Sequence, residues 1–157
     1  MGECLQAVFW YNENMEIRLS GHSAYSTEYH IVFIPKYRRR VLNPGVAQYL
    51  SKLLPKVLKQ MPDCFILEKN IKIDHIHLAM VIPPKYRVSD VIARIKQYTS
   101  SKLRKRFSYL KKVYWQESVL WSKGFFVSTI GLNKEKILTY IKYQQNQDSG
   151  QAKLAIK

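Results

Sequence analysis

The sequence lacks a long apolar run and has little cysteine. No apolar stretch in its 157 residues approaches the roughly 20 residues that cross a bilayer as a helix. The first residues carry acid rather than the basic and then apolar segments of a targeting peptide. The two cysteines, Cys4 and Cys64, match no metal or redox spacing such as Cys-x-x-Cys. We therefore expect a soluble, untargeted protein of a cytoplasmic, reducing compartment, with both thiols free and partly buried.

Internal repeats, low-complexity tracts and Gly/Ser linkers are also missing. A 46% hydrophobic composition is enough for one core at this length, so a single domain is the expectation. Residues 1–24 differ from the rest of the chain. They contain two β-prone stretches, Val8–Tyr11 and Met15–Leu19, which form either two short strands or a loosely attached extension.

Acidic residues are scarce. The chain has 11 Asp and Glu against 26 Lys and Arg, a net charge of +15. Such an excess repels itself unless a polyanion balances it. Nucleic acid is the commonest such partner, and an anionic membrane surface is the second. We favour nucleic acid, because the chain ends show neither a basic amphipathic helix with bulky apolar anchors nor a lipidation signal.

Apolar periodicity and turn residues predict seven elements in the remainder of the chain. In order they are a strand over Tyr29–Ile34, a helix over Gly45–Met61 that Pro55 kinks or splits, two strands over Phe65–Glu68 and Lys72–Ile82 around Lys69-Asn70, a helix from an N-cap at Ser89 to about Phe107, a strand over Phe125–Ile130, and a helix from Asn133 to about Gln147. This alternation is typical of an α+β, ferredoxin-like (RRM-like) antiparallel β-sheet with helices on one face.

Two basic segments are candidates for nucleic-acid binding. One follows the first strand, and the other spans Lys85 to Lys112, where ten basic residues and one acid surround Tyr86, Tyr98 and Tyr109. Such a one-sided charge favours a phosphate-contacting surface over a merely solvated face, with the tyrosines stacking on unpaired bases. The candidate DNA-binding residues are Lys36, Arg38, Arg39, Arg40, Arg94, Arg104 and Lys105.

His75 and His77 are candidates for metal binding. Side chains alternate along a strand, so these two point the same way while Ile76 and Leu78 point into the core. Two imidazoles one step apart can share a cation. Taken alone the pair is more often structural or merely exposed, and a metal site normally needs a third protein ligand.

The last helix contains a tyrosine and a glutamine that project on one face. Tyr140 and Gln144 are four residues apart, about 40° around a helix. By themselves they have an ordinary alternative, in which the tyrosine packs and the glutamine is solvated. Tyr143 and Gln147 repeat the spacing one turn later, so the pattern alone does not choose between the two pairs.

Four segments together resemble the single-tyrosine HUH transposases, and more narrowly the IS200-like insertion-sequence family. They occur in the family's order, and four ordered motifs are far more specific than any one. They are Tyr29-His30-Ile31-Val32-Phe33-Ile34-Pro35-Lys36-Tyr37-Arg38, Asp74-His75-Ile76-His77-Leu78, Trp121-Ser122-Lys123-Gly124-Phe125-Phe126-Val127-Ser128-Thr129-Ile130-Gly131 and Tyr140-Ile141-Lys142-Tyr143-Gln144. The resemblance implies a catalytic domain over 25–147 and a C-terminal tail over 148–157. Residues 1–24 are not covered by the resemblance and are expected to be an N-terminal extension.

The resemblance also implies residue roles. His75 and His77 would bind Mg²⁺ or Mn²⁺ with Gln144 as third ligand, and Tyr140, on a C-terminal helix, would be the nucleophile. The expected enzyme is a prokaryotic homodimer, with possible exchange of the tyrosine helix between subunits. It would cut and rejoin single-stranded DNA at hairpins near insertion-sequence ends through a covalent 5′-phosphotyrosine.

Two alternatives remain at this stage. The first is a non-enzymatic, single-stranded nucleic-acid-binding module on the same fold. Such modules place aromatic residues on the central strands, whereas this sequence offers two histidines there. The second is a domesticated or inactive relative, because intact motifs show only capacity.

Overall fold

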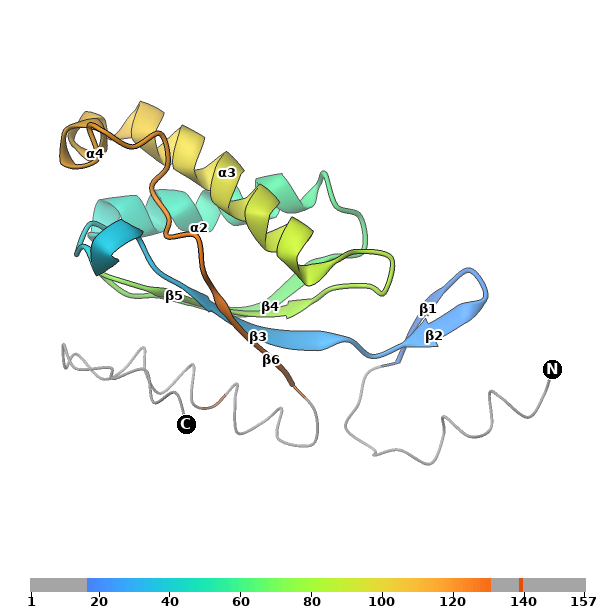
Figure 1. Ribbon diagram of the computed structural model, residues 1–157. Helices are drawn as coiled ribbons and strands as arrows, with labels where there is room; N and C mark the ends of the chain where they lie inside the picture. The colour runs from blue at the N-terminus through green and yellow to red at the C-terminus, as the bar shows by residue number, and fades with distance from the viewer. Residues whose placement is uncertain (1–16, 131–138, 140–157) are drawn as a thin grey trace.

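A computed structural model describes residues 17–130 and Thr139 (Figure 1). Within these residues the chain forms β1 (Arg18–Ser20), β2 (Ser23–Tyr25), β3 (Glu28–Phe33), the short turn η2 (Lys36–Arg38), α2 (Pro44–Leu58), β4 (Phe65–Ile71), β5 (Ile76–Val81), α3 (Val88–Arg106), α4 (Ser108–Val113) and β6 (Phe126–Thr129). No helix in the described part of the chain is long and apolar enough to span a membrane.

Four strands form the main sheet in the order β4-β5-β3-β6, and every neighbouring pair is antiparallel. Helix α2 joins β3 to β4, and α3 followed by α4 joins β5 to β6, so two βαβ units are interleaved. Figure 1 shows α2 and α3 together on one side of the sheet. This is the expected α+β, ferredoxin-like arrangement, and it leaves the other face of the sheet without a described helix.

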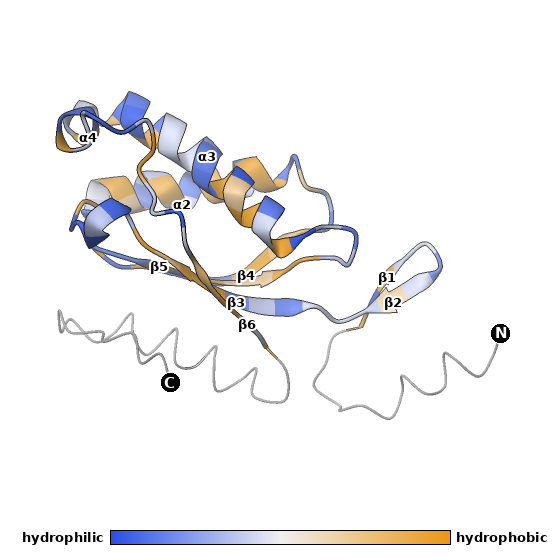
Figure 2. Cartoon of the chain, in the orientation of Figure 1, coloured by the Kyte–Doolittle hydropathy of each residue, from blue (hydrophilic) through white to orange (hydrophobic). Residues whose placement is uncertain are grey.

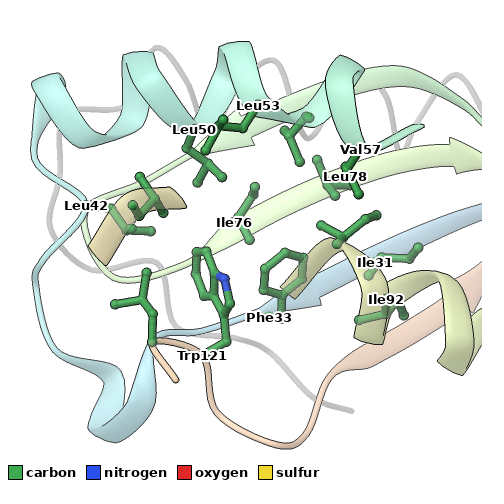
Figure 3. Close-up of a cluster of buried hydrophobic side chains, with 14 of the residues drawn as sticks. Ile31, Phe33, Leu42, Leu50, Leu53, Val57, Ile76, Leu78, Ile92 and Trp121 are labelled. Atoms are coloured by element: carbon green, nitrogen blue, oxygen red, sulfur yellow. The ribbon is translucent and has the colours of Figure 1, made fainter. Parts of the chain in front are cut away.

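The core lies between the sheet and these two helices. Side chains of alternate strand residues, including Ile31, Phe33, Ile76 and Leu78, are at most 2% exposed and pack into one cluster with residues of α2 and α3 (Figure 3). Polar residues alternate with apolar ones along both helices, as expected for helices with one buried face (Figure 2). Because side chains alternate along a strand, the residues between these core residues point to the opposite face of the sheet.

Helix α2 is continuous from Pro44 to Leu58. Of the two effects expected at Pro55, a kink or a split of the helix, the split is therefore wrong. It starts at Pro44, where the Asn43 side chain caps it by accepting a hydrogen bond from the Val46 amide at 3.0 Å. Pro55 lies in the last turn and is exposed. The Ser51 carbonyl has no amide partner at Pro55, and the buried residues of the helix continue past Pro55 to Val57.

Helix α3 begins two residues earlier than Ser89 as N-cap would require. Its N-cap is Arg87, which makes no side-chain capping bond, and Asp90 supplies a negative charge in the first turn. Ser100 is buried and accepts a hydrogen bond from the Leu120 amide at 2.8 Å. The helix therefore anchors the segment that leads into β6.

The hairpin between β4 and β5 turns later than the sequence indicates. Residues Lys69 and Asn70 belong to β4, and the turn covers Lys72 to His75, closed by a 2.8 Å bond from the Lys72 amide to the His75 carbonyl. A register shift between Ile66 and Glu68 accommodates the longer strand. His75 consequently lies at the end of the turn, one residue before β5, rather than within the strand.

A separate two-stranded hairpin, β1–β2, precedes the main sheet. Its turn contains Gly21 at φ 55°, a left-handed conformation that glycine adopts without steric cost. Strand β1 overlaps the expected strand over Met15–Leu19. The expected strand over Val8–Tyr11 lies outside the described residues, as does the expected helix after Asn133.

Candidate metal centre and nucleic-acid surface

His77 lies on β5 with its side chain on the sheet face away from α2 and α3. Its register partners are Val32 on β3 and Asn70 on β4, whereas the neighbouring Ile76 and Leu78 belong to the core cluster. The expected alternation is therefore confirmed for this strand. His77 is only 4% exposed.

His75 is brought beside His77 by the turn rather than by strand alternation. Their ring centroids are 5.0 Å apart with an angle of 78° between the planes, and His75 is 3% exposed. Two buried imidazoles at this separation are close enough to share one cation. The expected pairing of these two side chains is thus present in the structure.

Asp74 orients His75. Nδ1 of His75 donates to Oδ1 of Asp74 at 2.7 Å, and Arg38 Nε donates to Oδ2 at 3.1 Å. Burial would by itself raise the pKa of Asp74, but these two hydrogen-bonded, positively polarised neighbours lower it. Asp74 is therefore an ionised acceptor that joins the basic segment after β3 to one of the two histidines.

A third histidine touches the pair. Nε2 of His30, on β3, lies 3.0 Å from Nδ1 of His77, and the ring of Phe126 meets His30 edge-on at 6.2 Å between centroids. Hydrogen bonds among the described residues thus engage Nδ1 of both His75 and His77. Nε2 of each ring is the nitrogen left for a ligand, which is the usual division of labour in metal-binding histidines. The two residues therefore fit a divalent cation.

The protonation of these imidazoles also suits a cation. Burial, followed by the charges of His75, His30 and Lys72, lowers the pKa of His77 to about 3. Burial likewise lowers the pKa of His30. A neutral imidazole is the form that binds metal.

The metal centre is incomplete among residues 17–130 and 139. No three histidine, cysteine, aspartate or glutamate side chains of that part of the chain come together as a site. Gln144 and Tyr140, the expected third ligand and nucleophile, lie outside the described residues. Their roles remain predictions.

The basic segment after β3 has an unusual backbone. Tyr37 and Arg38 adopt left-handed conformations, with φ of 60° and 48°, which cost about 1 to 3 kcal/mol in residues with a side chain. Side-chain contacts hold both: Tyr37 donates from its hydroxyl to Glu117 at 3.1 Å, and Arg38 bonds Asp74. Lys36 also pairs with Glu117.

Tyr114 joins the two candidate DNA-binding segments. Its hydroxyl donates to the Lys36 carbonyl at 3.0 Å, and Arg104 of α3 donates to its carbonyl at 3.5 Å. The guanidinium of Arg39 lies 5.5 Å from the Tyr114 ring centre, within cation–π range. We call the surface formed by Lys36, Arg38, Arg39 and Arg104 the basic ridge.

The structure does not bring all seven candidate DNA-binding residues together. Arg94 and Lys105 are exposed and Arg104 is half-buried, all on α3. This helix lies on one side of the sheet (Figure 1), the side to which Ile76 and Leu78 point and His77 does not. Arg38 alone is linked to the histidine pair, through Asp74. Arg40 is exposed beside the ridge.

The tyrosines expected to stack on bases are placed otherwise. Tyr86, Tyr98 and Tyr109 are partly buried against the core, and Tyr109 donates to the Val41 carbonyl at 2.9 Å. The most exposed aromatic side chains in the described part of the chain are Trp115, 76% exposed, and Tyr37, 71% exposed. No pattern in the sequence singles out Trp115 beyond its position next to a basic segment.

His30 and Asp74 are the other residues that the sequence reasoning missed. Both lie inside the quoted motif segments, yet nothing in a strand pattern shows that His30 will meet a residue 47 positions away. The cross-strand register creates that contact. Asp74 precedes the candidate ligand in the chain, and its contact with the ring of His75 depends on the conformation of the turn between β4 and β5.

The described part of the chain is therefore an α+β protein with a ferredoxin-like sheet, a buried histidine pair and an exposed basic surface. A family model described as "Transposase IS200 like" matches residues 23–144. The chain belongs to this family of transposases, which confirms the resemblance of its four segments.

Individual transposases are also similar to this chain in sequence. Transposases for insertion sequence element IS200 from Salmonella typhimurium and Salmonella typhi are each 36% identical over 135 residues, 86% of this chain and 88% of theirs. The ISDra2 transposase TnpA of Deinococcus radiodurans is 24% identical over 135 residues, 85% of this chain and 95% of its own.

Two solved structures share the fold. A crystal structure from Deinococcus radiodurans, described as a transposase, has a TM-score of 0.66 at 23% identity and covers 82% of this chain and 97% of its own. A REP-associated tyrosine transposase bound to a REP hairpin has a TM-score of 0.58 at 17% identity, with 80% and 72% covered. At these identities the likeness establishes the fold.

Proposed function

We propose that this transposase cuts and rejoins single-stranded DNA at hairpin-bearing element ends, with Tyr140 as nucleophile and a divalent cation as cofactor. The observation that carries the proposal is the buried pair His75 and His77, in which Nδ1 of each ring is engaged and Nε2 is left. A purely DNA-binding module has no need of two buried imidazoles arranged in this way. Family membership supports the same reading.

His75, His77 and the side-chain oxygen of Gln144 would hold Mg²⁺ or Mn²⁺. When bound, such a cation polarises a phosphate oxygen and helps to neutralise charge that develops at phosphorus. Imidazole nitrogens with one amide oxygen leave coordination positions for a phosphate.

Tyr140 would perform the transfer. Its hydroxyl oxygen forms a bond to phosphorus as the bond from phosphorus to the 3′ oxygen breaks, so the phenol loses a proton and the 3′ oxygen gains one. A tyrosine in water has a pKa of about 10, so the phenol needs help to lose that proton. The products are a 5′-phosphotyrosine and a free 3′-hydroxyl. One phosphodiester replaces another, and rejoining therefore needs no ATP.

The basic ridge would hold the DNA backbone. Lys and Arg side chains neutralise phosphates and release counterions, while the exposed Trp115 and Tyr37 offer surfaces on which unpaired bases stack. Arg38 would place a phosphate near the metal centre, because it already contacts Asp74. The REP-associated neighbour, which is bound to a hairpin, supports a hairpin as the substrate.

A covalent adduct tests the reaction. Labelled single-stranded ends of the protein's own element are incubated with Mg²⁺ and run on a denaturing gel. The proposal expects a protein–DNA adduct that disappears with Tyr140→Phe and persists with the matched control Tyr143→Phe. If the adduct instead persists with Tyr140→Phe and disappears with Tyr143→Phe, the nucleophile is Tyr143. If the wild type forms no adduct, the protein is a DNA-binding module or an inactive relative.

A homodimer with exchanged tyrosine helices belongs to the same proposal. Mixing His77→Ala protein with Tyr140→Phe protein tests it, because one composite site of the mixed dimer then has both intact parts. Adduct formation by the mixture, absent from either variant alone, supports exchange. An inactive mixture whose dimers are shown to have reassorted contradicts it.

A further inference from the structure

His30 and His77 are joined edge to edge. Their planes are within 4° of parallel, the ring centroids are 5.2 Å apart, and Nε2 of His30 is 3.0 Å from Nδ1 of His77. The centroids are farther apart than these two nitrogens by about the centre-to-nitrogen distance of both rings together, so the nitrogens lie near the line between the ring centres. The contact therefore runs close to the common ring plane. That is the direction of an imidazole N–H bond and of an imidazole lone pair.

Such a hydrogen bond has two arrangements when both rings are neutral. In the first, His30 donates from Nε2, so His77 carries its own proton on Nε2. In the second, His77 donates from Nδ1 and His30 accepts at Nε2. A neutral imidazole carries one proton, so only the second arrangement leaves the Nε2 lone pair of His77 available for a cation.

We infer that His30 is a positioning residue that accepts a hydrogen bond from Nδ1 of His77 and so keeps Nε2 of His77 ready to bind a divalent cation. The inference rests on the proposed function, since it takes His77 to be a metal ligand. His30 acts through His77 and does not itself contact the ion, because its Nε2 is used in the bond between the rings.

Asp74 shows the same device on the other histidine. A carboxylate accepts only, so Nδ1 of His75 must donate to it at 2.7 Å and Nε2 of His75 is left unprotonated. With His30 as acceptor, His75 and His77 each have a protonated Nδ1 and an unprotonated Nε2 that faces the cation. An acceptor on the far side of each ligand ring is the usual support of a metal-binding histidine.

The tautomer is measurable without metal. Long-range ¹H–¹⁵N spectra of metal-free protein labelled at the imidazole nitrogens distinguish a protonated from an unprotonated Nε2. We expect an unprotonated Nε2 on His77 in the wild type. His30→Phe keeps a ring but has no hydrogen-bond acceptor. In this variant we expect that His77 is no longer held in the one tautomer with an unprotonated Nε2. A protonated Nε2 on His77 of the wild type overturns the inference.

Metal affinity supplies the second readout. Mn²⁺ binding, followed by electron paramagnetic resonance, is expected to weaken about 10- to 100-fold in His30→Phe. His30→Gln should recover most of it, because the amide oxygen accepts a hydrogen bond near the position of Nε2. Ser128→Ala is the matched control, since Ser128 is the register partner of His30 on β6. Far-UV circular dichroism and melting temperature confirm that each variant folds.

The outcomes separate the two claims. If the wild type and Ser128→Ala bind Mn²⁺ and folded His30→Phe binds it equally well, the role of His30 fails and the proposed function stands. If His30→Gln is as weak as His30→Phe, acceptance of a hydrogen bond is not the role of His30. If the wild type binds no Mn²⁺, the cofactor of the proposed function fails, and this inference fails with it.

Discussion

Nδ1 of His75 donates to the carboxylate of Asp74 across 2.7 Å, so a candidate metal ligand is oriented by the residue directly before it in the chain. The same carboxylate receives Arg38 at 3.1 Å. A continuous polar connection therefore runs from the basic ridge to the histidine pair. A phosphate held at Arg38 and a cation held at His75 would be only one side chain apart.

Asp74→Ala is expected to weaken Mn²⁺ binding about 10- to 100-fold, because removal of an outer hydrogen-bond partner frees the ligand ring and its tautomer. Asp74→Asn keeps an acceptor oxygen and should lose less. Isothermal titration calorimetry measures both. Asp90→Ala is the control, since Asp90 is an exposed acid on α3; equal affinities for Asp74→Ala and Asp90→Ala would remove Asp74 from the account.

The free energy of unfolding of the metal-free protein should depend on pH through the protonation of His77. Its pKa of about 3 in the folded state is below the value of about 6.5 expected when unfolded. Between these two values the unfolded state binds the extra proton, so the free energy of unfolding falls as the pH is lowered from about 6.5 towards 3. The slope from this group is at most about 1.4 kcal/mol per pH unit.

Urea unfolding at pH 7 and pH 5, in the presence of a chelator, measures that dependence. In His77→Gln the side chain no longer titrates, and the stability difference between the two pH values should shrink. The variant supplies the contribution of all other groups, and the wild type supplies that contribution together with the contribution of His77. An unchanged difference in the variant would show that His77 protonates equally easily in both states.

The α3 part of the DNA surface should affect binding rather than chemistry. Simultaneous replacement of Arg94, Arg104 and Lys105 by alanine is expected to weaken hairpin binding and to reduce the salt slope by about 0.7 for each lost phosphate contact. Adduct formation at saturating DNA should be retained, because α3 covers the face of the sheet opposite His77. Fluorescence anisotropy at several salt concentrations measures the slope.

A charge-matched control separates local contacts from net charge. Lys52, Lys56 and Lys59 are exposed, in or just after α2, and their triple alanine variant loses the same formal charge. We expect its salt slope to remain near that of the wild type. Identical salt slopes for the two triple variants would mean that α3 makes no specific phosphate contacts.

Trp115→Ala should weaken binding of single-stranded DNA about 5- to 150-fold, because stacking of one base on an aromatic ring contributes about 1 to 3 kcal/mol. Trp115→Phe should retain most of the affinity. The melting temperature should change little, since Trp115 is 76% exposed. Val119→Ala, an exposed neighbour in the same segment, is the control; an effect of equal size there would argue against stacking.

Sequence periodicity predicted the fold well where local rules decide it. The strand over Tyr29–Ile34 and the buried face of α3 at Val91, Ile92 and Ile95 follow from spacings of two and of three to four residues. Pairing of the two histidines was predicted from alternation. The structure reaches that result by a different path, with His75 at the end of a turn.

Contacts between distant segments were beyond this kind of prediction. Lys69 and Asn70 have turn-like composition but are held in β4 by pairing with β5, so tertiary context overrides local preference. Contacts of His30 with His77, and of Tyr114 with Lys36, depend on strand register and on loop packing. A single sequence does not encode these in any short-range pattern.

The most direct test of the account is the metal dependence of adduct formation by the full chain on its own element ends. With Mg²⁺ the wild type should form a covalent protein–DNA adduct, and a chelator should abolish it. His75→Ala and His77→Ala, if folded, should form no adduct at any pH where the wild type is active. An adduct that forms equally well without a divalent cation, or in both histidine variants, would contradict the central claim.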